Sequence, residues 1–279
     1  MSRPYAEVIG DPIAHSKSPL IHNFWLGKLG IDAEYRACHV RPEELQDYFA
    51  RRRGDAEWRG CNVTVPHKEA ATHCVEALLP GYEDIGAINL AVCRNGALFG
   101  GNTDLDGVIG PINQYHDKIF NFGNVPPRKV GIIGAGGAAR AAIAALKATG
   151  WVGEWRIAVR RPERGRMLMD TFGIAGSVVQ LTDQDFSGLD ILINASTMGM
   201  GETQDSPLKL DRLGDQALLF DMVYSPVETG LIRAAQRQGY AVIGGLEMLV
   251  GQASSAFHHF FGETPPRGSY AELRALLTA

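Results

Sequence analysis

The chain alternates between short apolar runs and longer segments in which apolar residues recur at helical spacing. Short runs predict strands, and a spacing of three to four residues predicts amphipathic helices. Ser18 and Pro19 are expected to open the first helix, with the serine oxygen capping free N–H groups. In the first half, strands are expected at 5–10, 34–40, 62–65, 87–93 and 97–101, and further helices over 42–52 and from Pro66. This alternation is typical of a mostly parallel sheet with helices on both faces.

A second α/β unit is expected after the proline pair Pro126-Pro127. It opens with an apolar strand, RKVGII, a glycine-rich turn and an alanine-rich helix, and further strands are expected at 155–160, 189–196, 218–224 and 240–245. From Glu247 onward, apolar residues fall on one face of a helix that could pack on either unit: Leu249, Ala253, Ala256, Phe257 and Phe260. The predicted fold class is therefore α/β, with two α/β domains.

Composition narrows the functional classes. Lys and Arg number 27 against 31 Asp and Glu, a net charge of −4, which argues against a nucleic-acid partner. The 4 cysteines form no CxxC pair, and no histidines show a metal-binding spacing, so no metal site is expected. No run of 18 apolar residues occurs, and the first residues lack an apolar signal core, which indicates a cytoplasmic protein without a membrane segment. Glycine is abundant, at 33 of 279 residues.

Several of these glycines form one motif, Gly134-Ala135-Gly136-Gly137-Ala138-Ala139, between a predicted strand and a predicted helix. This GxGxxA pattern is typical of dinucleotide binding. One glycine makes the tight turn, another lets backbone N–H groups reach a pyrophosphate, and a small third residue lets the helix approach the strand. The helix N-terminus adds partial positive charge. The motif therefore predicts a Rossmann domain.

The strand after this helix indicates which dinucleotide is preferred. An NAD site usually carries an acidic residue at the end of that strand, whereas here the strand ends in Ala158-Val159-Arg160-Arg161. Five arginines lie close together in this stretch: Arg156, Arg160, Arg161, Arg164 and Arg166. Guanidinium groups bind phosphate in bidentate geometry, so NADP is predicted, with NAD left open as an alternative.

Polar clusters recur at strand or helix ends of the first half: His15-Ser16-Lys17-Ser18-Pro19, Asn62 to Lys68, Gly86 to Asn89, and Gly101 to Asp104. Loops at the carboxyl ends of parallel strands converge, and ligands bind there. Serine hydroxyls can donate to a carboxylate, and Asn and Asp can bind vicinal hydroxyls. These clusters predict a site for a small polyol acid.

The chain resembles the shikimate dehydrogenase family over nearly its whole length. Eight blocks match the family pattern in order: GDPIAHSKSPLIHN (10–23), NVTVPHK (62–68), GAIN (86–89), NTD (102–104), GAGGAAR (134–140), NAS…GMG (194–201), DMVYSP (221–226) and GLEMLVGQ (245–252). The resemblance implies a cytosolic, two-domain, NADP-dependent enzyme that interconverts 3-dehydroshikimate and shikimate. It also implies that the C-terminal helix returns to the substrate domain, which would comprise 1–106 and 246–279, with the Rossmann domain at 107–245.

The resemblance also implies roles for individual residues. Ser16 and Ser18 would bind the substrate carboxylate, and Lys68 and Asp104 would form the catalytic pair. Ring hydroxyls would be contacted by Asn62, Thr64, Asn89, Asp104 and Gln252, and Tyr224 would line the substrate site. The cofactor would be held by Gly134, Ala135, Gly136, Gly137, Ala138, Arg160, Arg161, Arg164 and Ser196, with Met222, Gly245 and Met248 near the nicotinamide.

Alcohol oxidation gives the lysine and the aspartate a chemical reason to be paired. Loss of hydride from carbon must be accompanied by loss of a proton from oxygen. A lysine at hydrogen-bond distance from that oxygen can handle the proton and the developing charge if a carboxylate positions it. Taken singly, Lys68 in a predicted helix also fits a surface lysine, and Asp104 fits an N-cap.

Three departures from the family pattern leave alternatives open. Val159 precedes Arg160 and Arg161 where the family usually has Asn-Arg-Thr, Leu90 stands where threonine usually follows Asn89, and Leu105-Asp106-Gly107 follows Asp104. A quinate dehydrogenase, a broad shikimate/quinate dehydrogenase or an enzyme for an amino analogue is the first alternative. A non-catalytic NADP-binding sensor is the second. The protein is expected to be a monomer or a homodimer, with a small-molecule substrate.

Overall fold

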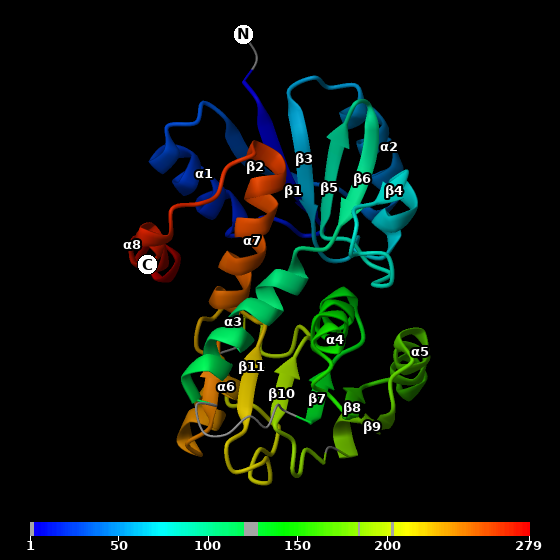
Figure 1. The fold of residues 1–279 in the computed structure, drawn as a ribbon, viewed down its shortest axis with the longest axis vertical. Helices are drawn as coiled ribbons and strands as arrows, with labels where there is room; N and C mark the ends of the chain where they lie inside the picture. Colours follow the sequence, from blue (N-terminus) through cyan, green and yellow to red (C-terminus); the bar gives the residue numbers. More distant parts are fainter. Residues whose placement is uncertain (1–2, 120–127, 184, 202–203) are drawn as a thin grey trace. The chain divides into compact units, whose positions relative to one another are not determined.

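The computed structural model describes residues 3–119, 128–183, 185–201 and 204–279 (Figure 1). The chain forms two compact units: unit 1 comprises Met1–Thr103 and Val250–Ala279, and unit 2 comprises Asp104–Leu249. The α/β fold class with two sheets is confirmed. The predicted boundaries, after 106 and before 246, fall close to those of the units. The proline pair at 126–127 lies outside the described residues.

Unit 1 is built on a sheet with the strand order β2-β1-β3-β5-β6-β4. β5 runs antiparallel to β3 and β6, and the other neighbouring strands are parallel. The strands are β1 (Tyr5–Gly10), β2 (Glu34–His39), β3 (Trp58–Val63), β4 (Ala77–Leu78), β5 (Leu90–Arg94) and β6 (Ala97–Gly101). The helices are α1 (Ser18–Leu29), α2 (Leu45–Arg53), α7 (Gly245–Phe261), whose later part belongs to this unit, and α8 (Tyr270–Thr278).

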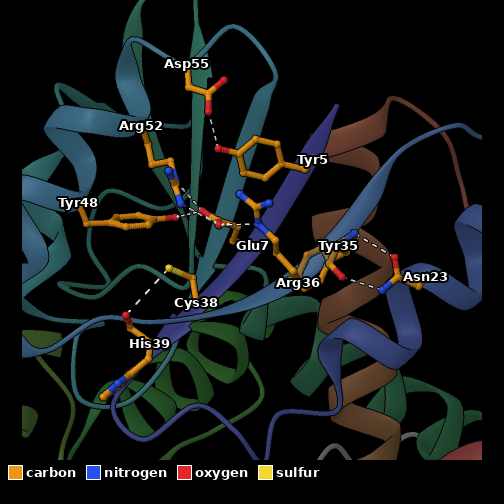
Figure 2. A network of polar contacts seen from close by, with 10 residues as sticks. All are labelled: Tyr5, Glu7, Asn23, Tyr35, Arg36, Cys38, His39, Tyr48, Arg52 and Asp55. Carbon is orange, nitrogen blue, oxygen red and sulfur yellow. Dashed lines mark hydrogen bonds and ion pairs between the residues drawn. The ribbon is translucent and has the colours of Figure 1, made fainter. Parts of the chain in front are cut away.

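One face of the unit 1 sheet carries a buried ionic cluster (Figure 2). The Glu7 carboxylate on β1 is 1% exposed and accepts hydrogen bonds from Arg52 Nε at 2.7 Å, from Arg36 Nε at 2.9 Å and from the Tyr48 hydroxyl at 2.7 Å. A buried carboxylate with charged and polar donors on both oxygens avoids the cost of an unpaired charge. These contacts join β1, β2 and α2.

Two elements of unit 1 differ from the sequence prediction. The helix predicted from Pro66 is absent: residues 65–68 form a turn, and only a short 3-10 helix follows (Ala70–Cys74). The segment predicted as one helix over 42–52 is a 3-10 turn (Pro42–Glu44) followed by α2. Proline fits the first turn of a helix and a tight turn equally well, so its presence alone did not distinguish the two.

Unit 2 contains an all-parallel sheet with the order β12-β11-β10-β7-β8-β9. Read from its other edge, the sheet has the 3-2-1-4-5-6 order of a dinucleotide-binding fold. Its strands are β7 (Lys129–Ile133), β8 (Glu154–Val159), β9 (Gly176–Gln180), β10 (Ile191–Asn194), β11 (Leu218–Asp221) and β12 (Ala241–Ile243). The helices are α3 (Asp104–Ile119), α4 (Gly137–Thr149), α5 (Pro162–Phe172) and α6 (Gly230–Arg237). β9 was not anticipated from the sequence.

Alternate residues of the central strands enter two separate apolar clusters, one on each face of this sheet. Ile132 and Ile193 pack with residues of α3 and α4, whereas Ile133 and Leu192 pack with residues of α6. Burial on both faces explains why these strands are apolar throughout, as the sequence pattern indicated.

The C-terminal segment belongs to unit 1, as the family resemblance implied. Phe257 and Phe260 of α7 are buried and contact the ring of His22 on α1. α8 is held to α1 by an ion pair between Lys28 Nζ and Glu272 Oε2 at 2.7 Å. No helix in the part of the chain that the structure describes is both long and apolar enough to cross a membrane.

Candidate functional site

The polar clusters of unit 1 gather on Asn89, a 2% exposed residue that directly precedes β5. Its Oδ1 accepts from the Thr103 backbone N–H at 2.7 Å, and its Nδ2 donates to Thr103 Oγ1 at 3.1 Å and to Gln252 Oε1 at 3.5 Å. Asn62 Nδ2 donates to the Asn89 carbonyl at 3.2 Å. Three of the predicted substrate residues are thus brought together from β3, the start of β5 and α7.

Lys68 lies at the end of the turn that follows β3. The Thr64 N–H donates to the Ile9 carbonyl at 2.9 Å, and the His67 N–H donates to the Thr64 carbonyl at 2.8 Å. The Lys68 carbonyl accepts from the Ile88 N–H at 2.8 Å, next to Asn89. His67, which is 1% exposed, lies within 2.7 Å of the Val40 carbonyl through Nε2. The turn is anchored on both sides, so the half-buried Lys68 side chain leaves from a fixed backbone.

Ser16 and Ser18 lie where the chain passes from β1 into α1. The Ser18 N–H donates to Ser16 Oγ at 3.3 Å, and Ser18 is 5% exposed. The prediction that Ser18 caps the helix is wrong by one position, because Lys17 is the N-cap and makes no side-chain cap bond. Ser18 is instead the first helical residue, and Pro19 the second. Its hydroxyl is therefore not used for capping.

Asp104 is the first residue of α3 and comes directly after Thr103 in the chain. Its side chain is almost fully buried, with 3% exposed. A carboxylate in the first turn of a helix is stabilised by the partial positive charge of the helix N-terminus. The structure therefore keeps Asp104 in a defined position rather than in solvent.

In unit 2, the glycine motif forms the turn between β7 and α4. Gly134 has φ +113°, and a Cβ there would lie 2.9 Å from the Ala195 carbonyl oxygen, so a side chain at this position would be strained. Gly134 follows β7 and Ala195 follows β10, so the carboxyl ends of these two strands lie close together here. The strand order reverses at this point, and ligands bind at such points in open α/β sheets. Ala135 and Ala138 are half-buried along the same turn.

Gly136 is the N-cap of α4 and has no side-chain cap. A Cβ on Gly136 would meet no atom within 4 Å, so the space in front of the first turn, which starts at Gly137, is open. The first turn carries no acidic residue. Open space, the N–H groups of the first helical turn and the helix dipole fit a dinucleotide pyrophosphate.

The predicted arginine cluster divides into two parts. Arg160 and Arg161, which follow β8, and Arg164 in α5 have exposed side chains. Arg156 lies elsewhere: its Nη1 donates to the Asp185 carbonyl at 2.7 Å and to the Ser187 carbonyl at 3.3 Å. Arg156 therefore lies apart from the arginines that are predicted to bind phosphate, because two residues of strand separate it from the carboxyl end of β8 at Val159.

The NAS and DMVYSP blocks form a buried hydrogen-bond network between β10 and β11. Asn194 Nδ2 donates to Asp221 Oδ1 at 2.9 Å, and Ser196 Oγ donates to Asn194 Oδ1 at 2.7 Å. Thr229 Oγ1 donates to Asp221 Oδ2 at 2.5 Å. Burial raises the pKa of the Asp221 carboxyl above its ordinary value. Ser196 is thus positioned next to Gly134 by residues that the sequence did not single out.

Gly245, the first residue of α7, approaches β11 closely. A Cβ there would lie 2.5 Å from the Val223 carbonyl, so no larger residue fits without movement of the backbone. Met222 and Met248 are buried in the same apolar cluster of unit 2, and Tyr224 is half-buried. The predicted nicotinamide residues therefore share one region of the unit.

Sequence reasoning missed several residues that hold the site. Thr103 lies inside a matched block, and its position beside Asp104 was a usable signal. Tyr35 donates from its hydroxyl to Asn62 Oδ1 at 2.6 Å, but it occurs in an ordinary strand pattern that marks no function. Among the described residues, no group of three or more His, Cys, Asp or Glu side chains could hold a metal ion.

Comparison with known proteins gives consistent results. A family model described as the shikimate dehydrogenase substrate binding domain matches residues 8–91. A relative named shikimate dehydrogenase (NADP(+)) from Sphingopyxis alaskensis is 46% identical over 277 residues, covering 99% of this chain and 97% of that protein.

Two solved structures have the same fold over almost the whole chain. Shikimate 5-dehydrogenase from Thermus thermophilus, in complex with NADP(H) and shikimate, has a TM-score of 0.83 at 31% identity and covers 98% of this chain and 99% of that one. The ligand-free 5-ketofructose reductase of a Gluconobacter species has a TM-score of 0.84 at 26% identity, with 99% of each chain covered. The full-length relative at 46% identity confirms the predicted family: this chain belongs to the shikimate dehydrogenase family.

Proposed function

We propose that this protein catalyses the NADP-dependent interconversion of 3-dehydroshikimate and shikimate. The proposal rests on two sites present in one chain. One is the Asn89 cluster, which consists of Asn62, Asn89, Thr103 and Gln252, and the other is the open glycine turn after β7. The 46% identity to an NADP(+) shikimate dehydrogenase supports it. Unit 1 would be the substrate and catalytic domain, and unit 2 the NADP-binding domain. The protein would act in the cytoplasm as a monomer or a homodimer.

The cofactor would bind along the carboxyl edge of the unit 2 sheet. The turn from Gly134 to Ala138 would hold the pyrophosphate through the backbone N–H groups that follow Gly134, because the Gly134 N–H itself donates to the Ala158 carbonyl at 2.9 Å. Arg160, Arg161 and Arg164 would hold the 2′-phosphate. Ser196, Met222, Gly245 and Met248 would lie along the rest of the cofactor. The nicotinamide, when bound, supplies the hydride acceptor or donor.

The substrate would be held mainly by polar residues of unit 1. Ser16 and Ser18 offer hydroxyl donors for the carboxylate, and the Ser18 hydroxyl is not used for capping. Ring hydroxyls would be bound by Asn62, Thr64, Asn89 and Gln252 of unit 1. Asp104 and Tyr224, which the family resemblance also assigns to the substrate, belong to unit 2. Amides both donate and accept, which suits hydroxyl groups.

Lys68 and Asp104 would handle the proton of the reacting hydroxyl. Lys68 leaves from an anchored turn, and Asp104 is held at the start of α3. An ammonium group at hydrogen-bond distance stabilises negative charge that develops on the oxygen and can exchange a proton with it.

A second substrate class is favoured by one comparison. The Gluconobacter reductase, which has the same fold, is named for a keto sugar rather than for shikimate. Leu90, which departs from the family pattern, directly follows Asn89 and is fully buried. We therefore retain quinate, an amino analogue and keto sugars as alternative substrates. A non-catalytic NADP-binding protein is the remaining alternative.

Initial rates with a panel of substrates test these proposals. We expect NADP reduction with shikimate and NADPH oxidation with 3-dehydroshikimate to give the highest kcat/KM. 5-Ketofructose, which lacks the carboxylate, should react at least about 100-fold more slowly, since a site built to bind a polar group discriminates strongly against analogues that lack it. Quinate, which keeps the carboxylate and the ring hydroxyls, should react more slowly than shikimate by a smaller factor. A higher kcat/KM with quinate or 5-ketofructose would assign the protein to that substrate. Binding of NADP without turnover of any substrate would identify a sensor.

The Lys68→Ala variant tests the catalytic assignment. We expect kcat to fall about 100-fold or more, the effect of a lost acid–base group, with a smaller change in KM for shikimate. Lys28→Ala is the matched control, because Lys28 lies in the same unit but pairs with Glu272 on α8. A kcat for Lys68→Ala equal to that of Lys28→Ala would refute the role of Lys68.

A further inference from the structure

Tyr35 and Asn62 lie on the two strands that flank β1. Tyr35 is opposite Ala6 on one side, and Asn62 is opposite Val8 on the other. Alternate residues of a strand share a face, so Ala6 and Val8 lie on the same side of β1. The Tyr35 side chain crosses β1 on this face, and its hydroxyl donates to Asn62 Oδ1 at 2.6 Å. Tyr35 is 1% and Asn62 5% exposed.

The bond to Asn89 decides the orientation of the Asn62 amide, and the bond from Tyr35 holds the amide there. A carbonyl oxygen can only accept, so the Asn62 atom 3.2 Å from the Asn89 carbonyl is Nδ2. Oδ1 therefore faces Tyr35, whose hydroxyl must donate. An amide has two N–H groups and two oxygen lone pairs. Bonds to other described residues use one of each, which leaves one donor and one acceptor of Asn62 for a bound molecule.

The Tyr35 side chain is itself fixed from several directions. Its ring stacks on the buried His22 ring, with a centroid distance of 3.9 Å and an interplanar angle of 4°. Its backbone is bracketed by Asn23, whose Nδ2 donates to the Tyr35 carbonyl at 2.6 Å and whose Oδ1 accepts from the Tyr35 N–H at 2.9 Å (Figure 2). Burial raises the pKa of the Tyr35 phenol, so the hydroxyl keeps its proton.

We propose that Tyr35 is a positioning residue for substrate binding, which holds the Asn62 amide in the one orientation that presents a donor and an acceptor to a vicinal diol. This role rests on the proposed function, in which Asn62 contacts ring hydroxyls. Tyr35 does not touch the substrate and acts only through Asn62. Hydrogen bonds run without a break from Tyr35 on the edge strand of unit 1 to Asn62, and from Asn62 to Asn89.

Steady-state kinetics of Tyr35→Phe test the proposal. The change removes only the hydroxyl and keeps the stacked ring. We expect KM for shikimate to rise about 3- to 10-fold, the range for loss of one buried hydrogen bond, while kcat and KM for NADP stay within about 2-fold. Tyr48→Phe is the matched control: its buried hydroxyl binds Glu7 instead, so KM for shikimate should not change.

A double-mutant cycle separates positioning from a general structural effect. Asn62→Ala alone should raise KM, and adding Tyr35→Phe should raise it no further, because the group that Tyr35 holds is absent. Replacement of Tyr35 by p-aminophenylalanine, which retains a donor at the same place, should restore the wild-type KM. This replacement also gives a result if Tyr35→Phe proves too unstable to assay.

Three outcomes would overturn the inference. The first is an unchanged KM for shikimate in Tyr35→Phe. The second is a KM in the double variant that equals the product of the two single increases. The third is an elevated KM in the p-aminophenylalanine protein. Failure of the wild-type protein to turn over shikimate is a different result. It would overturn the proposed function and, with it, this role of Tyr35.

Discussion

Among single residues of unit 1, His22 is the least typical. Its side chain is fully buried, and neither ring nitrogen has a hydrogen-bond partner among the described residues. Burial lowers the pKa of His22 to about 3. The ring is therefore neutral and serves as a flat aromatic surface against Tyr35 and Phe257.

The buried histidine makes stability depend on pH. The pKa is about 6.5 in the unfolded chain and about 3 in the folded one, so the unfolded state binds more protons between these values. Stability is therefore lost as pH falls below about 6.5. Between pH 7 and pH 5 the contribution of one such group is about 2 kcal/mol.

The variant His22→Phe keeps a ring and removes the titration. In urea unfolding, the loss of unfolding free energy between pH 7 and pH 5 should be about 2 kcal/mol smaller in His22→Phe than in the wild-type protein. His258→Phe, at an exposed position of α7, should show the wild-type loss. An equal loss in His22→Phe and wild type would contradict the assignment.

At the same scale, the sequence predicted the identity of many candidate residues but not their partners. Asn62, Asn89 and Gln252 were singled out, and the structure brings them together. Tyr35 and Thr103 were not singled out, because Tyr35 reaches Asn62 across β1 and Thr103 bonds to Asn89, and both partners are distant in the chain. Only the paired strands and α7 bring these groups within hydrogen-bond distance.

At the scale of elements, the turn after β8 is where the cofactor preference is expected to arise. It places Arg160 and Arg161 at the carboxyl end of β8, next in the sheet to β7 and its glycine turn. Arg156, on the same strand, is used to hold the loop at 185–187. Closeness in the sequence grouped these arginines, because it does not show the backbone carbonyls that Arg156 binds.

The double variant Arg160→Ala/Arg161→Ala tests this turn. We expect KM for NADP to rise about 10- to 100-fold, since bonds from charged groups to a phosphate contribute about 1.5–3 kcal/mol. KM for NAD, which lacks the 2′-phosphate, should change much less. Arg156→Ala should leave both KM values unchanged. Equal increases for NADP and NAD would contradict phosphate recognition by this turn.

At the scale of the whole molecule, unit 1 is assembled from two distant stretches of chain. Residues 250–279 supply Phe257 and Phe260, which pack against His22 on α1. Unit 2 is continuous, and its two apolar clusters come from within 104–249. The two units therefore differ in whether a continuous fragment contains the complete core.

Fragments should reflect this difference. We expect residues 104–249 to fold alone and residues 1–103 to show no cooperative thermal unfolding by circular dichroism, because the apolar face of their sheet lacks α7. Replacing 104–249 by a Gly/Ser linker of about six residues should restore cooperative unfolding. Such a short linker can join the two stretches because Thr103 and Gln252 both bond to Asn89 and therefore lie close together. Cooperative unfolding of 1–103 alone would contradict this view.

The sequence by itself determined the α/β class, the Rossmann motif and the family, because apolar periodicity and spaced glycines are local and survive in a linear chain. The tertiary structure decided which face α7 covers, that Lys68 leaves from a turn, that Arg156 lies apart from Arg160, and that Tyr35 holds Asn62. These features depend on strand order and on contacts between residues far apart in the chain. No local pattern encodes such contacts, because the same side chains are compatible with many partners until the sheet is formed.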